Sequence, residues 1–135
     1  MVLVDTNVLV DVVEADPAWS GWSRRELEML AATRPLLINP IVYAELSIAF
    51  ARIEELERVI GKMELRYEEL PRSALFLAGK AFADYRRRGG SRGSILPDFL
   101  IGAHAAVTGA SLLTRDTARY RVYFPTVELI SPATH

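Results

Sequence analysis

Residues 1–11, MVLVDTNVLVD, decide the fold predicted for this chain. The apolar run at 2–4 is typical of a buried strand, and residues 7–14 predict a short helix directly after it. Asp5 stands between them as the only charged side chain in the first ten residues. A buried ionised carboxylate costs several kcal/mol unless a cation or hydrogen bonds compensate it. A functional role for Asp5 is therefore favoured over a place in the core.

The same alternation of short apolar runs and helical stretches continues to the end of the chain. It is the pattern of an α/β protein with a parallel sheet. Further strands are predicted at 36–38, 66–70, 111–114 and 127–130, and further helices at 22–33, 40–52, 53–63, 73–88 and 98–109. Asn39 is expected to cap the helix that follows it, with Pro40 at the first helical position.

Length and composition bound the function only broadly. The 135 residues predict one domain, and the net charge of −1 indicates no particular partner. The absence of Cys excludes disulfides and thiolate metal sites and fits a cytoplasmic location. The apolar start has no basic region before it, so no signal peptide is expected. No uncharged apolar run has the length and continuity needed to span a membrane.

Three more acids are candidates for the same site as Asp5. Two of them are isolated in uncharged stretches, and the third follows a predicted strand. Glu45 and Asp98 each stand alone in a long uncharged stretch, and Asp116 follows the predicted strand at 111–114. Sites in parallel α/β sheets form beyond the carboxyl ends of the strands. All four acids can converge at that edge of the sheet.

Carboxylates gathered in this way suit a hard divalent cation such as Mg²⁺ or Mn²⁺. Such an ion activates water and stabilises charge in phosphodiester hydrolysis, and clustered like charges are expected to raise some of the carboxyl pKa values. Two of these acids also have a structural alternative. Asp98 could be a helix N-cap after Pro97, and Asp116 could be a turn residue or the cap of 117–123. Asn7 can cap the first helix, and its amide oxygen could also face a metal-bound water.

The basic residues Arg86, Arg87, Arg88 and Arg92 form a cluster with two interpretations. They are either a solvated helix end, where cations complement the helix dipole, or phosphate contacts that lead RNA to the acids. Arg24 and Arg25 could add to the same surface. His104 is expected to be a partly buried or surface residue with no assigned role.

Four segments together resemble a known family. DTNVLVD at 5–11, the isolated Glu45, PDFLIGAHA at 97–105 and LLTRD at 112–116 resemble the PIN-domain ribonucleases. Among these, the short chain looks like the VapC toxins of bacterial and archaeal toxin–antitoxin pairs. Gly102 stands where that family often has Ala.

This resemblance implies a three-layer α/β/α fold around a central, mostly parallel sheet of four to five strands, with residues 1–135 forming a single PIN domain. It implies an endoribonuclease that binds Mg²⁺ or Mn²⁺ through Asp5, Glu45, Asp98 and Asp116, with Asn7 and Thr114 in support. The implied partners are an RNA substrate, a VapB-type antitoxin and a second copy of the chain, with no membrane.

Other functions stay open at this point. A nuclease in RNA maturation would have the same chemistry, and a non-catalytic PIN-like module would bind RNA or a partner without cutting it. A dehalogenase-like phosphatase would want Asp at position 7, which is Asn, and a receiver domain would want a late Lys, while none follows Lys80.

Overall fold

The computed structural model describes residues 1–91 and 96–132 of the chain. Helices and strands alternate through these residues as the sequence predicts. The strands are β1 (Val2–Val4), β2 (Leu36–Ile38), β3 (Leu65–Tyr67), β4 (Ser111–Leu113) and β5 (Leu129–Ile130). The helices are α1 (Thr6–Val13), α2 (Ser20–Ala31), α3 (Pro40–Ser47), α4 (Ile53–Lys62), α5 (Arg72–Arg87), α6 (Leu96–Thr108) and α7 (Ala118–Tyr123).

Within the described ranges, five strands form one sheet in the order β3-β2-β1-β4-β5. Every neighbouring pair is parallel, with Leu3 opposite Leu37 on one side and Leu112 on the other. The predicted α/β class with a mostly parallel sheet of four to five strands is confirmed. Because all strands run the same way, their carboxyl ends lie at one edge of the sheet.

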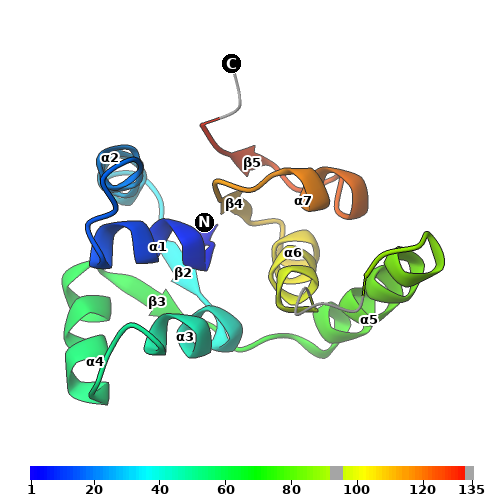
Figure 1. Ribbon diagram of the computed structural model, residues 1–135, viewed down its shortest axis with the longest axis horizontal. Helices are drawn as coiled ribbons and strands as arrows, with labels where there is room; N and C mark the ends of the chain where they lie inside the picture. Colours follow the sequence, from blue (N-terminus) through cyan, green and yellow to red (C-terminus); the bar gives the residue numbers. More distant parts are fainter. Residues whose placement is uncertain (92–95, 133–135) are drawn as a thin grey trace.

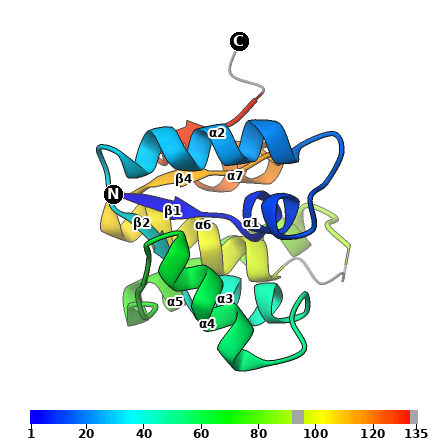
Figure 2. The same cartoon turned by 90° about the vertical axis from the view of Figure 1, so that its left-hand side faces the viewer.

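Helices cover both faces of this sheet. Figure 1 shows α1, α2 and α4 on one side of the strands and α6 and α7 on the other, with α5 packed beyond α6. The turned view of Figure 2 places β1 and β4 between α2 above and α6 below. Helix α3 contacts both α1 and α6. The arrangement agrees with the predicted three layers.

The two helical layers explain why the central strands are apolar throughout. Val2, Leu3 and Val4 are all buried, as are the three residues of β2 and of β4. Strands covered on both faces lack the alternation of half-exposed strands. In the part of the chain that the structure describes, no helix combines the length and apolar character required to cross a membrane.

Several predicted boundaries were wrong. The helix predicted over 40–52 ends at Ser47, where the hydroxyl donates to the carbonyl oxygen of Ala44 at 2.6 Å. The next amides, of Ile48 and Ala49, bond three residues back instead of four, so the turn tightens and the helix stops. Ile48, just after the end of the helix, is 86% exposed. The strand predicted at 66–70 is shorter and begins one residue earlier, as β3, and only the last two residues of the strand predicted at 127–130 form β5.

Helix α6 approaches the end of α7 closely at Gly102. A Cβ atom on Gly102 would lie 2.4 Å from Cδ2 of Phe124, which is the C-cap residue of α7. The tight contact at Gly102 is therefore between α6 and the aromatic ring that follows α7.

Candidate active site

Asp5 lies where β1 ends and α1 begins. Its Oδ1 accepts the backbone N–H of Thr6 at 2.7 Å, which makes Asp5 the N-cap of α1. Its Oδ2 accepts two hydroxyl groups, from Thr114 at 2.8 Å and from Tyr120 at 2.9 Å. The expectation that Asn7 caps this helix was wrong, because the helix starts at Thr6 and places Asn7 inside it.

Burial raises the pKa of Asp5 to about 6. The hydroxyl groups of Thr114 and Tyr120 lower this pKa, and the negative charge of Asp98 raises it. Desolvation disfavours the charged carboxylate, while donated hydrogen bonds favour it. The raised pKa agrees with the expectation for clustered acids, although burial is a larger cause than repulsion.

Asp98 lies in the first turn of α6 and pairs with an arginine. Nη1 of Arg119 donates to Oδ2 of Asp98 at 2.6 Å. Burial is the first cause that raises the pKa of Asp98; Arg119 lowers it, and the charges of Asp116 and Glu45 raise it further. Asp98 therefore interacts electrostatically with each of the other three predicted site acids.

Glu45 projects from α3 and is partly buried. Its Oε1 accepts the hydroxyl of Thr6 at 2.7 Å, which links α3 to the first residue of α1. The start of α3 is fixed as predicted, because Oδ1 of Asn39 accepts the Val42 amide at 2.9 Å.

The side chain of Asn39 also contacts His104, which is buried beside it. Nδ2 of Asn39 lies 3.1 Å from Nδ1 of His104, and His104 is only 2% exposed. Burial lowers the pKa of His104. A neutral ring whose Nδ1 accepts from Asn39 fits this geometry. The expected partly exposed position was wrong, since the residue connects α6 to the cap of α3.

Thr114 and Asn7 organise the loop after β4. Oγ1 of Thr114 accepts the Asp116 amide at 3.1 Å, and Oδ1 of Asn7 accepts the Arg115 amide at 3.3 Å. Nδ2 of Asn7 lies 3.4 Å from Oγ1 of Thr114. Asp116 itself is exposed and does not cap α7, where Thr117 is the N-cap residue. Both predicted supporting residues therefore contact the loop that carries Asp116.

One buried group near this loop was missed by sequence reasoning. Asp11 is 3% exposed and accepts Nε and Nη2 of Arg115 at 2.6 Å and 2.9 Å. The hydroxyl of Ser23, on α2, adds a third bond at 2.8 Å. The guanidinium of Arg115 also lies over the ring of Trp19. The sequence feature that could have indicated this buried ion pair is Asp11 itself, because it is a second acid in an apolar helical stretch.

The four predicted acids fit a divalent cation by their chemistry, as hard carboxylate oxygens that repel one another without a counter-ion. Among residues 1–91 and 96–132, however, no three Asp, Glu, His or Cys side chains are close enough to hold one ion together. Asp5 is held by hydroxyl groups and Asp98 by Arg119. Ion binding would thus require local rearrangement of these side chains.

The predicted RNA-binding arginines lie at the carboxyl end of α5. Arg86, Arg87 and Arg88 are exposed, and Arg92 lies outside the described residues. Arg88 forms an ion pair with Asp84 at 3.2 Å and lies over the ring of Tyr123. Helix α2, which carries Arg24 and Arg25, is on the other side of the sheet (Figure 1), so those two residues do not extend this surface.

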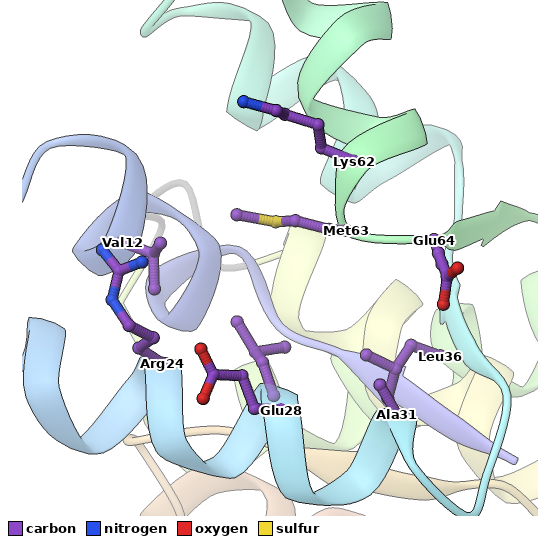
Figure 3. Close-up of a pocket in the computed structure, with 9 residues that line it drawn as sticks. Val12, Arg24, Glu28, Ala31, Leu36, Lys62, Met63 and Glu64 are labelled. Carbon is purple, nitrogen blue, oxygen red and sulfur yellow. The ribbon is translucent and has the colours of Figure 1, made fainter.

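A cavity of about 390 Å³ opens between α2 and the end of α4. Figure 3 shows Arg24, Glu28, Lys62 and Glu64 around an apolar lining that includes Met63 and Leu36. Leu36 begins β2, so the cavity lies toward the amino edge of the sheet. None of the four predicted acids lines this cavity.

The structure is an α/β protein with a parallel sheet, and Asp5 and Asp116 lie beyond the carboxyl ends of two neighbouring strands, β1 and β4. The PIN domain family model matches residues 2–125, and the chain belongs to this family. No curated protein gives a significant match to the sequence.

Solved structures share the fold at low sequence identity. VapBC2 from Rickettsia felis, bound to a promoter DNA fragment, has a chain with 23% identity and a TM-score of 0.75, covering 97% of this chain and 98% of that one. FitAcB from Neisseria gonorrhoeae gives 20% identity and a TM-score of 0.75, with full coverage of both chains. VapC20 from Mycobacterium tuberculosis, a toxin that cleaves the sarcin–ricin loop, gives 18% identity, a TM-score of 0.62 and coverage of 95% and 99%.

Proposed function

We propose that this chain, as a single PIN domain over residues 1–135, is a metal-dependent endoribonuclease. The observation that carries the proposal is a set of hydrogen bonds that links acids from distant parts of the sequence. Thr114 donates to Asp5 at 2.8 Å and accepts the Asp116 amide at 3.1 Å, and the Thr6 hydroxyl donates to Glu45 at 2.7 Å. The negative charge of Asp98 also raises the pKa of Asp5. Membership of the PIN family supports the same function, because PIN domains are generally nucleases.

Each acid has a role in this proposal. Asp5 and Asp98 would be the principal ligands of Mg²⁺ or Mn²⁺, and Glu45 and Asp116 would bind directly or through water. An ion held there would supply a water molecule of lowered pKa, an oriented phosphate and stabilisation of charge on the leaving oxygen. One carboxylate accepts a proton from the attacking water, whose oxygen bonds to phosphorus as the bond to the leaving ribose oxygen breaks.

The supporting residues keep these acids in place. Thr114 donates to Asp5 and accepts the Asp116 amide, so one hydroxyl group connects two of the acids. Thr6 does the same for a third acid, since its amide donates to Asp5 and its hydroxyl donates to Glu45. Arg86, Arg87, Arg88 and Arg92 are proposed to bind the RNA backbone, where cations supply affinity without base specificity.

The biological role proposed is that of a VapC-type toxin in the cytoplasm. The likeness to chains of VapBC complexes over nearly their whole length supports this role. The proposed partners are a VapB-type antitoxin and a second copy of the chain. A nuclease in RNA maturation shares the chemistry, and an antitoxin reading frame beside the gene would distinguish the toxin.

The test is cleavage of a structured RNA pool by the purified protein with Mg²⁺ or Mn²⁺, with EDTA, and after Asp5→Asn. We expect cuts that need the metal and that disappear in the variant. Asn preserves the size of the side chain and an oxygen that can cap α1, so loss of cleavage would not follow from loss of the helix.

Two failures have different meanings. If cleavage is absent but Mn²⁺ binds to the wild type and not to Asp5→Asn, the metal site is correct and the RNA pool lacks the substrate. If neither protein binds Mn²⁺, the four acids are structural and the proposal is wrong.

A further inference from the structure

Arg119 places a positive charge directly on one of the four acids. Its Nη1 lies 2.6 Å from Oδ2 of Asp98, and its guanidinium carbon lies 5.7 Å from the centroid of the Tyr85 ring. The side chains of Arg119 and Asp98 remain 28% and 33% exposed. The pair is thus open to solvent and can separate without unpacking the core.

This contact is distinctive within the site. In the part of the chain that the structure describes, no other Lys or Arg forms an ion pair with Asp5, Glu45, Asp98 or Asp116. Arg115, four residues earlier, pairs with Asp11 instead. Arg119 is therefore the counter-ion of the acidic site in the absence of a metal.

A guanidinium and a divalent ion compete for the same carboxylate, because both bind through its oxygen lone pairs. Resting on the proposed function, we infer that Arg119 leaves Asp98 when the divalent ion binds and then binds the scissile phosphate of the RNA. A phosphate bound to an ion at Asp98 would lie close to the carboxylate that Arg119 already contacts.

The chemistry of arginine suits this exchange. The guanidinium fork matches two phosphate oxygens as well as it matches a carboxylate, and the charge persists at every physiological pH. The Tyr85 ring can hold the guanidinium plane near the site after the ion pair breaks. Arg119 would then lower the metal affinity of the free protein and raise its affinity for RNA once metal is bound.

The experiment measures Mn²⁺ binding to the full-length protein by calorimetry without RNA. Arg119→Gln should bind Mn²⁺ about tenfold more tightly than the wild type, because a charge-assisted bond to Asp98 is removed. Arg119→Lys, which keeps the charge without the fork, should lie between them. Arg121→Gln, an exposed arginine of the same helix, is the matched control and should differ by about twofold or less.

Cleavage kinetics at saturating Mn²⁺ test the second half of the exchange. Arg119→Gln should raise the KM for RNA about tenfold, whereas Arg121→Gln should not. A wild type that binds Mn²⁺ with the same affinity as Arg119→Gln would overturn the exchange and leave the nuclease proposal intact. Tighter Mn²⁺ binding with an unchanged KM would overturn the phosphate contact, and no Mn²⁺ binding by any of the proteins would overturn both proposals.

Discussion

Nε of Arg115 lies 2.6 Å from Oδ2 of Asp11, and this ion pair joins the loop after β4 to α1 across 104 residues of sequence. Asp11 is almost completely buried and also accepts the hydroxyl of Ser23. The loop that presents Thr114 and Asp116 is thereby fixed against the helix that Asp5 caps. A contact outside the acidic site thus sets the position of two of its residues.

Arg115→Met should destabilise the protein by about 3 kcal/mol, because it leaves Asp11 as a buried charge without its cation. Methionine retains an apolar stem beside Trp19, so the loss in free energy of unfolding measures the removal of the positive charge from Asp11. Urea denaturation measures the free energy of unfolding, with Arg121→Met as the exposed control expected to change it by about 0.5 kcal/mol or less. A loss below about 1 kcal/mol, the range of exposed pairs, would show that solvent reaches Asp11.

The raised pKa of Asp5 makes stability depend on pH. The folded pKa is about 6, whereas an unfolded Asp has a pKa of about 3.9. Between these values the folded state binds more protons, so the free energy of unfolding falls as pH rises. At about 1.4 kcal/mol per pKa unit, Asp5 should account for a loss of about 3 kcal/mol between about pH 4 and about pH 6.

Urea denaturation in EDTA over a pH series checks this loss by comparing the wild type with Asp5→Asn. The variant has no charge to desolvate at this position, so its stability should fall less steeply over the same interval. Parallel curves for the two proteins would mean that Asp5 has an ordinary pKa in the folded state.

Tyr120→Phe should move metal binding to higher pH. The phenol donates to Oδ2 of Asp5 and lowers the pKa of that carboxyl. Without this bond the pKa of Asp5 rises further, and protons compete with Mn²⁺ up to a higher pH. Mn²⁺ affinity measured over a series of pH values would show the shift. Tyr123→Phe, on the same helix, is the control, and an equal shift in both variants would contradict the role of the Asp5 bond.

Thr6→Val should reduce RNA cleavage about tenfold, in the range found when a residue that orients a metal ligand is removed. The Thr6 hydroxyl donates to Oε1 of Glu45, and valine keeps the shape but not the donor. Thr6→Ser keeps the hydroxyl and should retain most of the activity. Initial cleavage rates at fixed Mn²⁺ measure the difference. Equal rates in Thr6→Val and the wild type would show that Glu45 needs no positioning by Thr6.

The parallel sheet could be predicted from the sequence, and Asp5, Glu45 and Asp98 could be selected as candidate site residues, because both depend on local patterns. Apolar runs followed by turn residues mark buried strands, and an acid without charged neighbours stands out against them. The carboxyl-edge rule for parallel sheets then brings the acids near one another. These steps need only the direction of the strands and the order of the elements.

The partners of the acids could not be predicted in the same way. Arg119 and Arg115 are four residues apart in an ordinary polar stretch, yet they pair with Asp98 and Asp11 respectively. Which arginine meets which acid depends on packing between distant elements. The cap of α1 shows a similar ambiguity, since Asp5 and Asn7 have equal capping chemistry and only the backbone conformation selects Asp5.

The contact between Gly102 and Phe124 limits how this chain can change. Helix α6 carries Asp98 on one of its turns, and α7 carries Arg119 and Tyr120 just before the phenylalanine. A methyl group at position 102 would push the ring away and move α7 relative to α6. An alanine at this position would require the Phe124 ring to move or a smaller side chain at 124. Among homologous sequences, positions 102 and 124 should therefore covary, although neither residue takes part in the chemistry.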